Sequence, residues 1–316
     1  MPPHCKPAAM RWPGISVVVP SYNCAGYLER ALASVQAQRY PADRVDIVVV
    51  DDGSVDDTPA VARRFAASDP RITVIEQANA GPAAARNRGI EASRGELVAF
   101  LDADDTWEPD KLALQAEVYC RDPLVGVIQC GARFVDAGGR PLKGWVRCSR
   151  VLRGDILLDY VCDFFLITSS VVVPRQCLDA VGWFDETLRI GEDHDLFLRL
   201  LARYPADGVD APLLNRTVRP DSLSRLDFDK DASTDLQLLD EFMATHPEFY
   251  RRHARRIDAR YADYLYLYGY RLMQEGQRDR AQQVLLRSLR RKPTLAAAKA
   301  LLRSSLPPTL VAALRT

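Results

Sequence analysis

The sequence predicts an α/β fold whose sheet is parallel and covered by helices on both faces. Four short apolar runs, rich in β-branched residues, alternate with stretches of helical periodicity along the first 110 residues. Such alternation is typical of parallel sheets, in which ligands gather at the carboxyl ends of the strands. We expect strands at 15–19, 45–50, 72–75 and 97–101, and helices at 27–38, 59–67, 83–93 and from about 110 onward.

A cluster of carboxylates follows the fourth run. Asp102, Asp104 and Asp105 stand in a turn between the apolar run at 97–101 and Pro109. Carboxylates this close raise one another's pKa unless a cation lies among them, and an oxygen-only ligand set selects a hard ion such as Mg²⁺ or Mn²⁺. The alternative interpretation is a solvated acidic loop that caps the next helix.

Polar residues also follow the first two strands. The first strand ends at Pro20, before Tyr22 and Asn23, and the second ends in Asp51 and Asp52. Because these strand ends meet the carboxylate cluster at one edge of the sheet, we expect a nucleotide there, with Tyr22 and Asp52 as candidates to bind its base. Neither GxGxxG nor GxxxxGK[ST] occurs, so a Rossmann dinucleotide site and a P-loop both lack their signatures.

The helix at 83–93 brings Arg86 and Asn87 to the same edge. An arginine offers a cationic fork to a phosphate or a sugar, and its alternative role is a surface ion pair.

Length and composition indicate about two domains outside the membrane. The chain has 316 residues, of which 47% are hydrophobic, enough for a sizeable core. No stretch approaches 18 consecutive apolar residues, and residues 1–13 lack the apolar core of a signal peptide. We therefore expect a cytoplasmic protein with a flexible N-terminus over 1–13. Its seven cysteines contain no CxxC pair, which suits neither a zinc site nor a complete disulfide framework.

The charge is unevenly distributed along the chain. Residues 251–316 hold 15 of the 42 Lys and Arg residues but only 4 of the 42 Asp and Glu residues, so they carry a net charge of +11 and residues 1–250 carry −11. Such a segment can attach peripherally to an anionic membrane, for example the inner face of the cell membrane. Its basic residues are spread at helical spacing, which favours a solvated helical face instead. No nucleic-acid partner is expected.

The second half of the first 225 residues is less regular. We expect strands at 125–130, 132–135 and 169–173, and acceptor-side loops within 137–165. The hydroxyls of Thr168, Ser169 and Ser170 could face substrate or satisfy backbone groups. Glu192, Asp193 and Asp195 begin a helix that continues through 196–201, where negative charge also interacts favourably with the helix dipole.

Beyond residue 224 the pattern is helical, at 235–244, 250–268 and 295–302. The residues Leu265, Gly269, Leu272, Gly276, Ala281, Leu285 and Pro293 fall at offsets that resemble one tetratricopeptide repeat, over about 262–295. One repeat cannot form a solenoid, so this hairpin is expected to pack on the rest of the chain or on a second copy in a homo-oligomer.

Several motifs together resemble glycosyltransferase family 2. They are Val17–Asn23 (VVVPSYN), Val49–Ser54 (VVDDGS), Gly81–Gly89 with Ala85-Arg86-Asn87, Phe100–Asp105 (FLDADD), Gly182–Glu186 (GWFDE) and Gly191–Leu196 (GEDHDL). The resemblance implies a GT-A fold over 14–224, with a nucleotide-sugar half at 14–110 and an acceptor half at 111–224, followed by the helical extension at 225–316.

The same resemblance implies the roles of individual residues. Asp104 and Asp102 would form the DxD element that holds Mn²⁺ or Mg²⁺, and Asp102 would also contact the donor nucleotide. Asp193, with Glu192 beside it, would act as the base that deprotonates the attacking hydroxyl in an inverting transfer. The remaining donor-binding candidates are Pro20, Tyr22, Asn23, Asp51, Asp52, Arg86, Asn87 and Arg219.

Arg219 marks a departure from the family pattern. Family members often carry a His in a segment resembling RxHPxSxS, and here Arg219 occupies that place within Thr217–Ser224. Because arginine does not ligate metals, it would pair with the donor diphosphate instead.

The resemblance implies a nucleotide-diphosphate sugar as donor and a glycan or lipid-linked acceptor in cell-surface polysaccharide synthesis. One alternative is a sugar nucleotidyltransferase, although the glycine-rich and basic N-terminal loop usual in such enzymes is missing. The other is a non-catalytic, nucleotide-binding interaction protein, against which the intact carboxylates argue.

Overall fold

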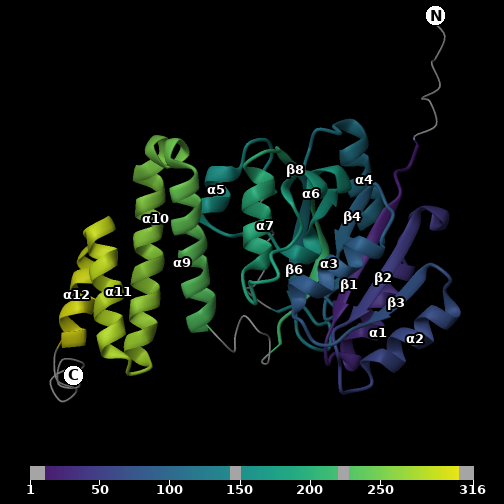
Figure 1. Cartoon of the computed structure of the whole chain (residues 1–316), viewed down its shortest axis with the longest axis horizontal. Coiled ribbons are helices and arrows are strands. Elements are labelled where there is room, and N and C mark those ends of the chain that lie inside the picture. The colour runs from purple at the N-terminus through teal and green to yellow at the C-terminus, as the bar shows by residue number, and fades with distance from the viewer. Residues whose placement is uncertain (1–10, 143–150, 220–227, 306–316) are drawn as a thin grey trace, which may run out of the picture. The chain divides into compact units, whose positions relative to one another are not determined.

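The computed structural model describes residues 11–142, 151–219 and 228–305 (Figure 1). Contacts divide these residues into two units. The sheet unit contains the described residues up to 157 and those at 165–219, and the helical unit contains residues 158–164 with the helices from 228 onward. The predicted boundary at 224 lies outside the described residues, as do residues 1–10 of the predicted N-terminal segment.

The described part of the sheet unit has one eight-stranded sheet in the order β3-β2-β1-β4-β7-β6-β8-β5 (Figure 1). The strands β3, β2, β1 and β4 are parallel, β7 runs antiparallel to β4 and β6, and β5 runs antiparallel to β8. The predicted α/β class and the first four strands are therefore confirmed, within a mixed sheet. The strands are β1 Ile15–Ser21, β2 Val45–Asp51, β3 Ile72–Glu76, β4 Leu97–Phe100, β5 Thr106–Trp107, β6 Val127–Val135, β7 Val172–Pro174 and β8 Ala206–Thr217.

Helices cover both faces of the parallel part of the sheet. Side chains on alternate residues of a strand point to opposite faces, so a single strand contributes to the packing on both sides. On one face, Val17 and Val19 of β1 belong to a large core with residues of α1, α2 and α4. On the other face, Val18 meets α3 so closely that a Cβ on Gly89 would lie 2.3 Å from its Cγ1. The helices are α1 Ala25–Gln36, α2 Thr58–Ser68, α3 Pro82–Ala92, α4 Lys111–Arg121, α5 Leu157–Cys162, α6 Arg175–Val181 and α7 Glu192–Leu201, with 3-10 turns at Ala42–Arg44 and Thr168–Ser170.

Two expectations for the second half were wrong in detail. The two strands expected at 125–130 and 132–135 are one strand, β6, whose pairing with β8 shifts register on both sides of Gly131. The strand expected at 169–173 is the shorter β7, because Thr168–Ser170 forms a 3-10 turn. The long strand β8 was not predicted.

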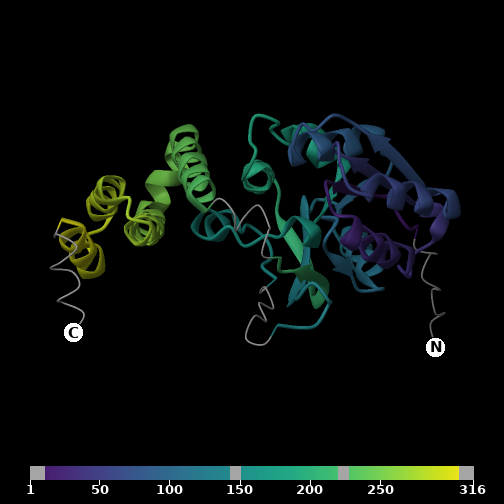
Figure 2. The same cartoon turned by 90° about the horizontal axis from the view of Figure 1, so that it is seen from below.

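The helical unit consists of α9 Phe228–Thr245, α10 Pro247–Gln274, α11 Arg278–Arg291 and α12 Leu295–Ser305, together with the segment at 158–164. Figures 1 and 2 show α9 to α12 as neighbouring helices, from the side and nearly end-on. Gly269 permits close packing of α10 on α11, since a Cβ there would lie 2.8 Å from Leu285 Cγ. The predicted hairpin is present, and its relation to tetratricopeptide repeats stays a prediction.

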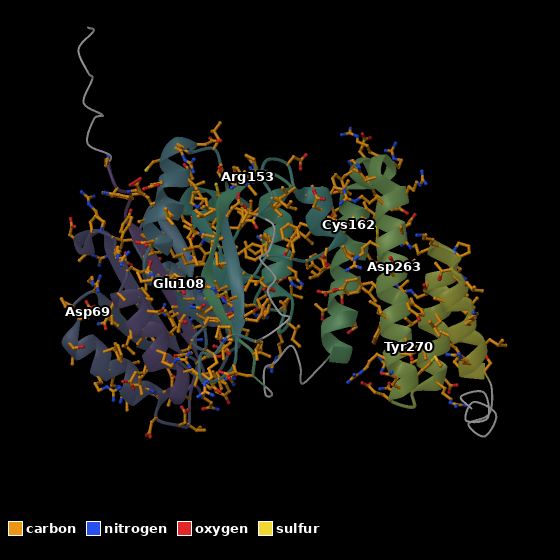
Figure 3. All side chains as sticks on the ribbon, turned by 180° about the vertical axis from the view of Figure 1, so that it is seen from behind. Asp69, Glu108, Arg153, Cys162, Asp263 and Tyr270 are labelled. Atoms are coloured by element: carbon orange, nitrogen blue, oxygen red, sulfur yellow. The ribbon has the colours of Figure 1, made fainter. Side chains whose placement is uncertain are left out.

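Residues 158–164 carry ion pairs to α10. Arg256 contacts Asp159 at 2.6 Å, and Arg260 donates to the Cys162 carbonyl oxygen at 2.7 Å, at the place where Figure 3 labels Cys162. This segment was expected in the acceptor half, yet its contacts group it with the helices. Among the described helices, none combines the length and apolarity that a membrane crossing requires.

Candidate functional site

The carboxylate cluster lies in the turn directly after β4. The Asp105 backbone N–H donates to the Asp102 carbonyl oxygen at 3.0 Å and closes the turn. The carboxyl group of Asp105 is buried and accepts a hydrogen bond from the Thr217 backbone N–H at 2.9 Å. In contrast, the side chains of Asp102 and Asp104 are 34% and 24% exposed. Asp102 and Asp104 are therefore available to a ligand, and Asp105 holds the turn to β8.

The electrostatics of this turn favour a cation. Burial raises the pKa of Asp104, the charge of Asp102 raises it further, and Arg219 opposes the shift. Burial, together with the negative charges of Asp104 and Asp102, raises the pKa of Asp105 well above its ordinary value. No group of three or more His, Cys, Asp or Glu side chains that could hold a metal occurs among the described residues. Two carboxylates alone suit Mg²⁺ or Mn²⁺ that takes its remaining ligands from substrate phosphates and water.

Arg86 of α3 connects this turn to the first turn of α7. Its Nη2 donates to Asp102 Oδ1 at 2.8 Å and its Nη1 donates to Glu192 Oε1 at 2.6 Å. The Arg86 side chain is only 7% exposed and its guanidinium lies over the Phe184 ring, 5.3 Å from the centroid. The predicted donor-binding arginine thus has both terminal nitrogens directed at carboxylates.

Asp193 follows Glu192 and is held from two sides. Its Oδ2 accepts a hydrogen bond from the Thr168 hydroxyl at 2.8 Å, and its Oδ1 accepts one from the His194 backbone N–H at 2.9 Å. Burial alone would raise the pKa of Asp193, but His194, Arg86 and the Thr168 hydroxyl outweigh it and lower the pKa, so the group is ionised near neutral pH. Burial raises the pKa of Glu192, and the Arg86 guanidinium opposes this shift.

The ends of β1 and β2 bring further predicted residues to the same edge, with β1 lying between β2 and β4 (Figure 1). Asn23 has a positive φ of 46° and its Oδ1 accepts a hydrogen bond from the Val55 backbone N–H at 2.9 Å. Tyr22, beside it, is 50% exposed, and Pro20 is paired with Val50.

Asp51 and Asp52 are buried and organise loops. Asp51 accepts hydrogen bonds from the Ser54 hydroxyl at 2.6 Å and the Ser54 backbone N–H at 3.1 Å. Asp52 accepts one from the Gln77 side chain at 2.8 Å and two from the backbone N–H groups of Ala80 and Gly81 at 2.9 and 2.8 Å. Carboxylate oxygens can accept additional hydrogen bonds, so these contacts do not prevent Asp51 and Asp52 from binding a nucleotide. Their donor-binding role stays a prediction.

Asn87 and Arg219 also make defined contacts. The Asn87 amide donates to the Phe184 carbonyl oxygen and to Glu186 Oε1, and its own Oδ1 accepts from the Phe184 backbone N–H. Arg219 Nη1 lies 3.4 Å from Asp104 Oδ2, and its guanidinium is 4.8 Å from the Tyr27 ring centroid. Arg219 is therefore next to the predicted metal ligands, whereas Asn87 fastens the segment that follows α6.

Beneath the turn, the structure adds residues whose roles were not assigned from the sequence. Ser169 Oγ accepts a hydrogen bond from the Asp102 backbone N–H at 3.0 Å, and the Ser169 carbonyl oxygen accepts one from Trp107 Nε1 at 2.8 Å. Lys111 is fully buried, with its Nζ 4.0 Å from the centroid of the Trp107 ring. Thr168 and Ser169 were noted only as a hydroxyl run that could face substrate or backbone. Ser169 satisfies a backbone group, the Asp102 N–H, as one of these alternatives states, whereas the Thr168 hydroxyl donates to the Asp193 carboxylate.

The family model for glycosyl transferase family 2 matches residues 16–163. TuaG of Bacillus subtilis, a candidate glycosyltransferase of teichuronic acid biosynthesis, is 42% identical over 214 residues, which are 67% of this chain and 82% of that protein. Other curated relatives are longer, and the matched regions span 37%, 35% and 32% of three of them.

Two solved structures have the same fold. TarS of S. aureus, residues 1–349 in complex with UDP-GlcNAc, superposes with a TM-score of 0.60 at 20% identity, covering 92% of this chain and 90% of that one. The mannosyltransferase PcManGT of Pyrobaculum calidifontis, in complex with GDP-Man and Mn²⁺, gives a TM-score of 0.60 at 21% identity, covering 97% and 92%. The predicted GT-A fold is confirmed.

Proposed function

Because the chain belongs to glycosyl transferase family 2, we propose that it is an inverting, metal-dependent glycosyltransferase. It moves a sugar from a nucleotide-diphosphate sugar to a hydroxyl of a glycan or lipid-linked acceptor in cell-surface polysaccharide synthesis. The observation that carries the proposal is the placement of two kinds of carboxylate at one edge of the sheet. Asp102 and Asp104 are accessible after β4, and the ionised Asp193 is joined to them through Glu192 and Arg86.

Asp102 and Asp104 would hold Mn²⁺ or Mg²⁺ together with the donor diphosphate. When bound, the ion would neutralise the negative charge that develops on the leaving diphosphate. Arg219, 3.4 Å from Asp104, adds a fixed positive charge next to the same phosphates. The complex of the PcManGT relative with GDP-Man and Mn²⁺ supports this assignment.

Asp193 accepts the proton of the acceptor hydroxyl while that oxygen attacks the anomeric carbon. The hydrogen bonds from Thr168 and from the His194 backbone direct its two oxygens and keep it ionised. A single displacement by that hydroxyl inverts the anomeric configuration, since the leaving diphosphate departs from the opposite face.

The nucleotide lies along the ends of β1 and β2. The half-exposed Tyr22 offers its ring to the base, with Pro20, Asn23, Asp51 and Asp52 around it. Asp52 acts mainly by shaping the loop at 77–81, and Asn87 by fixing the segment at 184–186. The UDP-GlcNAc complex of TarS favours a uridine-linked donor as the first to be tested.

The experiment is a panel of uridine-, deoxythymidine- and guanosine-linked sugars with Mn²⁺, Mg²⁺ or a chelator, scored by nucleotide release and by calorimetry with UDP. We expect the wild type to lose most of its affinity for UDP when the ion is chelated. Asp104→Ala should lose most of this affinity even in the presence of Mn²⁺. Asp110→Ala removes an exposed carboxylate of the neighbouring segment and serves as the control. Equal affinity of the wild type with and without the ion would refute the metal assignment.

A further inference from the structure

Among the residues that the structure describes, Arg86 alone forms ion pairs both with the turn at 102–105, the proposed metal-binding turn, and with the first turn of α7. Asp102 lies 16 residues after Arg86 in the sequence, and Glu192 lies 106 residues after it. The two hydrogen bonds come from different nitrogens of a single planar guanidinium, so a shift of the guanidinium towards one carboxylate alters its contact with the other.

Because Arg86 is buried, the loss of either carboxylate partner is energetically unfavourable. The Phe184 ring covers the guanidinium, and its Nε is buried with no hydrogen-bond partner in the part of the chain that the structure describes. On the side of Glu192, whose side chain is only 9% exposed, water cannot readily replace a lost carboxylate, and an uncompensated buried charge is strongly unfavourable. The positive charge of Arg86 is offset by Asp102 and Glu192, which it contacts directly, and by the nearby charge of Asp193.

We propose that Arg86 is a positioning residue that couples the metal-binding turn to the acceptor-side carboxylates, so that Glu192 sets the affinity for a metal ion that it does not touch. This inference rests on the proposed function, because it assumes that Asp102 and Asp104 hold the ion. It assigns Arg86 to two of the protein's own carboxylates, whereas the sequence alone left open a donor phosphate or sugar and a surface ion pair.

The direction of the coupling follows from charge. With Glu192 ionised, much of the Arg86 charge is neutralised on the side away from Asp102, and the field at the metal position is more negative. Without that carboxylate, the full guanidinium charge acts on Asp102 and repels a divalent ion. Reciprocally, an ion bound at Asp102 strengthens the hold of Arg86 on Glu192, next to the base Asp193.

Glu192→Gln tests the proposal, since glutamine keeps the shape of glutamate and removes its charge. Calorimetry with UDP in the presence of Mn²⁺, and Mn²⁺ binding followed by electron paramagnetic resonance, should show about tenfold weaker binding than the wild type. The control is Asp195→Asn, in the same turn of α7, whose carboxylate is held by Arg199 rather than by Arg86. This control should stay within about twofold of the wild type, because Arg199 does not contact the metal-binding turn.

A double-variant cycle with Arg86→Gln then identifies the route of the coupling. In that background Glu192→Gln should change the Mn²⁺ affinity by less than about twofold, because the bridging charge is gone. Circular dichroism checks that the variants are folded, and the comparison of Glu192→Gln with Asp195→Asn stands without the Arg86 variants.

The outcomes separate the inference from the function beneath it. A wild type that binds UDP equally with and without Mn²⁺ refutes the metal site and the coupling together. A wild type that requires Mn²⁺, with Glu192→Gln binding it normally, refutes only the coupling. Equal losses in Glu192→Gln and Asp195→Asn would show a general loss of negative charge and would likewise overturn the role of Arg86.

Discussion

Lys111 should make the stability of the sheet unit depend on pH in the alkaline range. Its side chain is fully buried, and its Nζ has no hydrogen-bond partner among the described residues and lies over the Trp107 ring. Burial lowers the pKa of Lys111 from 10.5 to about 8. One pKa unit corresponds to about 1.4 kcal/mol, so the buried ammonium costs about 3 kcal/mol at neutral pH.

Whether stability rises or falls with pH depends on how many protons the folded and the unfolded chain bind. Below pH 8 the amine is protonated in both the folded and the unfolded chain, and the folded state bears the full cost. Between about pH 8 and 10.5 the folded chain releases the proton while the unfolded chain keeps it, so the unfolded state binds more protons and stability rises with pH. Above that range the amine is neutral in both states and its contribution no longer changes.

Lys111→Met should therefore be more stable than the wild type at pH 7, by up to about 3 kcal/mol less roughly 1 kcal/mol for the lost cation–π contact. Urea unfolding followed by tryptophan fluorescence measures this, since Trp12, Trp107 and Trp183 all lie in the sheet unit. The difference between variant and wild type should shrink from pH 8 to 10.5. The exposed Lys299 provides the control variant, Lys299→Met. A difference that is the same at pH 7 and pH 10 would refute the reasoning.

Two further predictions concern the base. Asp193→Asn should lower kcat by about 10²–10⁴-fold, roughly 3–5 kcal/mol of barrier, with unchanged donor affinity, and turnover within a few-fold of wild type would move the base to another carboxylate. Thr168→Val removes a hydrogen bond to the ionised form of Asp193 that is worth about 1.5–3 kcal/mol, so the pKa of Asp193 should rise and the acid limb of the pH–rate profile should move to higher pH. Thr168→Ser should restore the profile, and the assignment fails if valine leaves the limb in place.

The sequence by itself determined the first half of the sheet and the place of the site. The strands β1, β2 and β4 contain continuous apolar runs, because inner strands of a parallel sheet are buried on both faces and this pattern is local in the sequence. The carboxylates Asp102, Asp104 and Asp193 could also be predicted from the sequence, because each stands in a short local motif that follows a strand or begins a helix. Alternation of strands and helices was enough to predict that several of these strand ends would meet at one edge.

The rest of the sheet was decided by tertiary contacts. The strand β8 mixes polar residues with Pro212, which faces Gly131 where the pairing with β6 shifts register. A strand with an internal proline lacks the regular alternation by which strands are recognised in a sequence, and it is stable here only through its partners.

The partners of the site residues were also beyond the sequence. Arg86 donates to Asp102 and Glu192, and Thr168 donates to Asp193, across separations of 16, 106 and 25 residues. A local pattern states that an arginine or a hydroxyl is present, but only the folded chain determines which acceptor comes within 3 Å. Burial makes these contacts necessary, because a charged group removed from water is unfavourable unless the fold supplies a partner of opposite charge or a hydrogen bond.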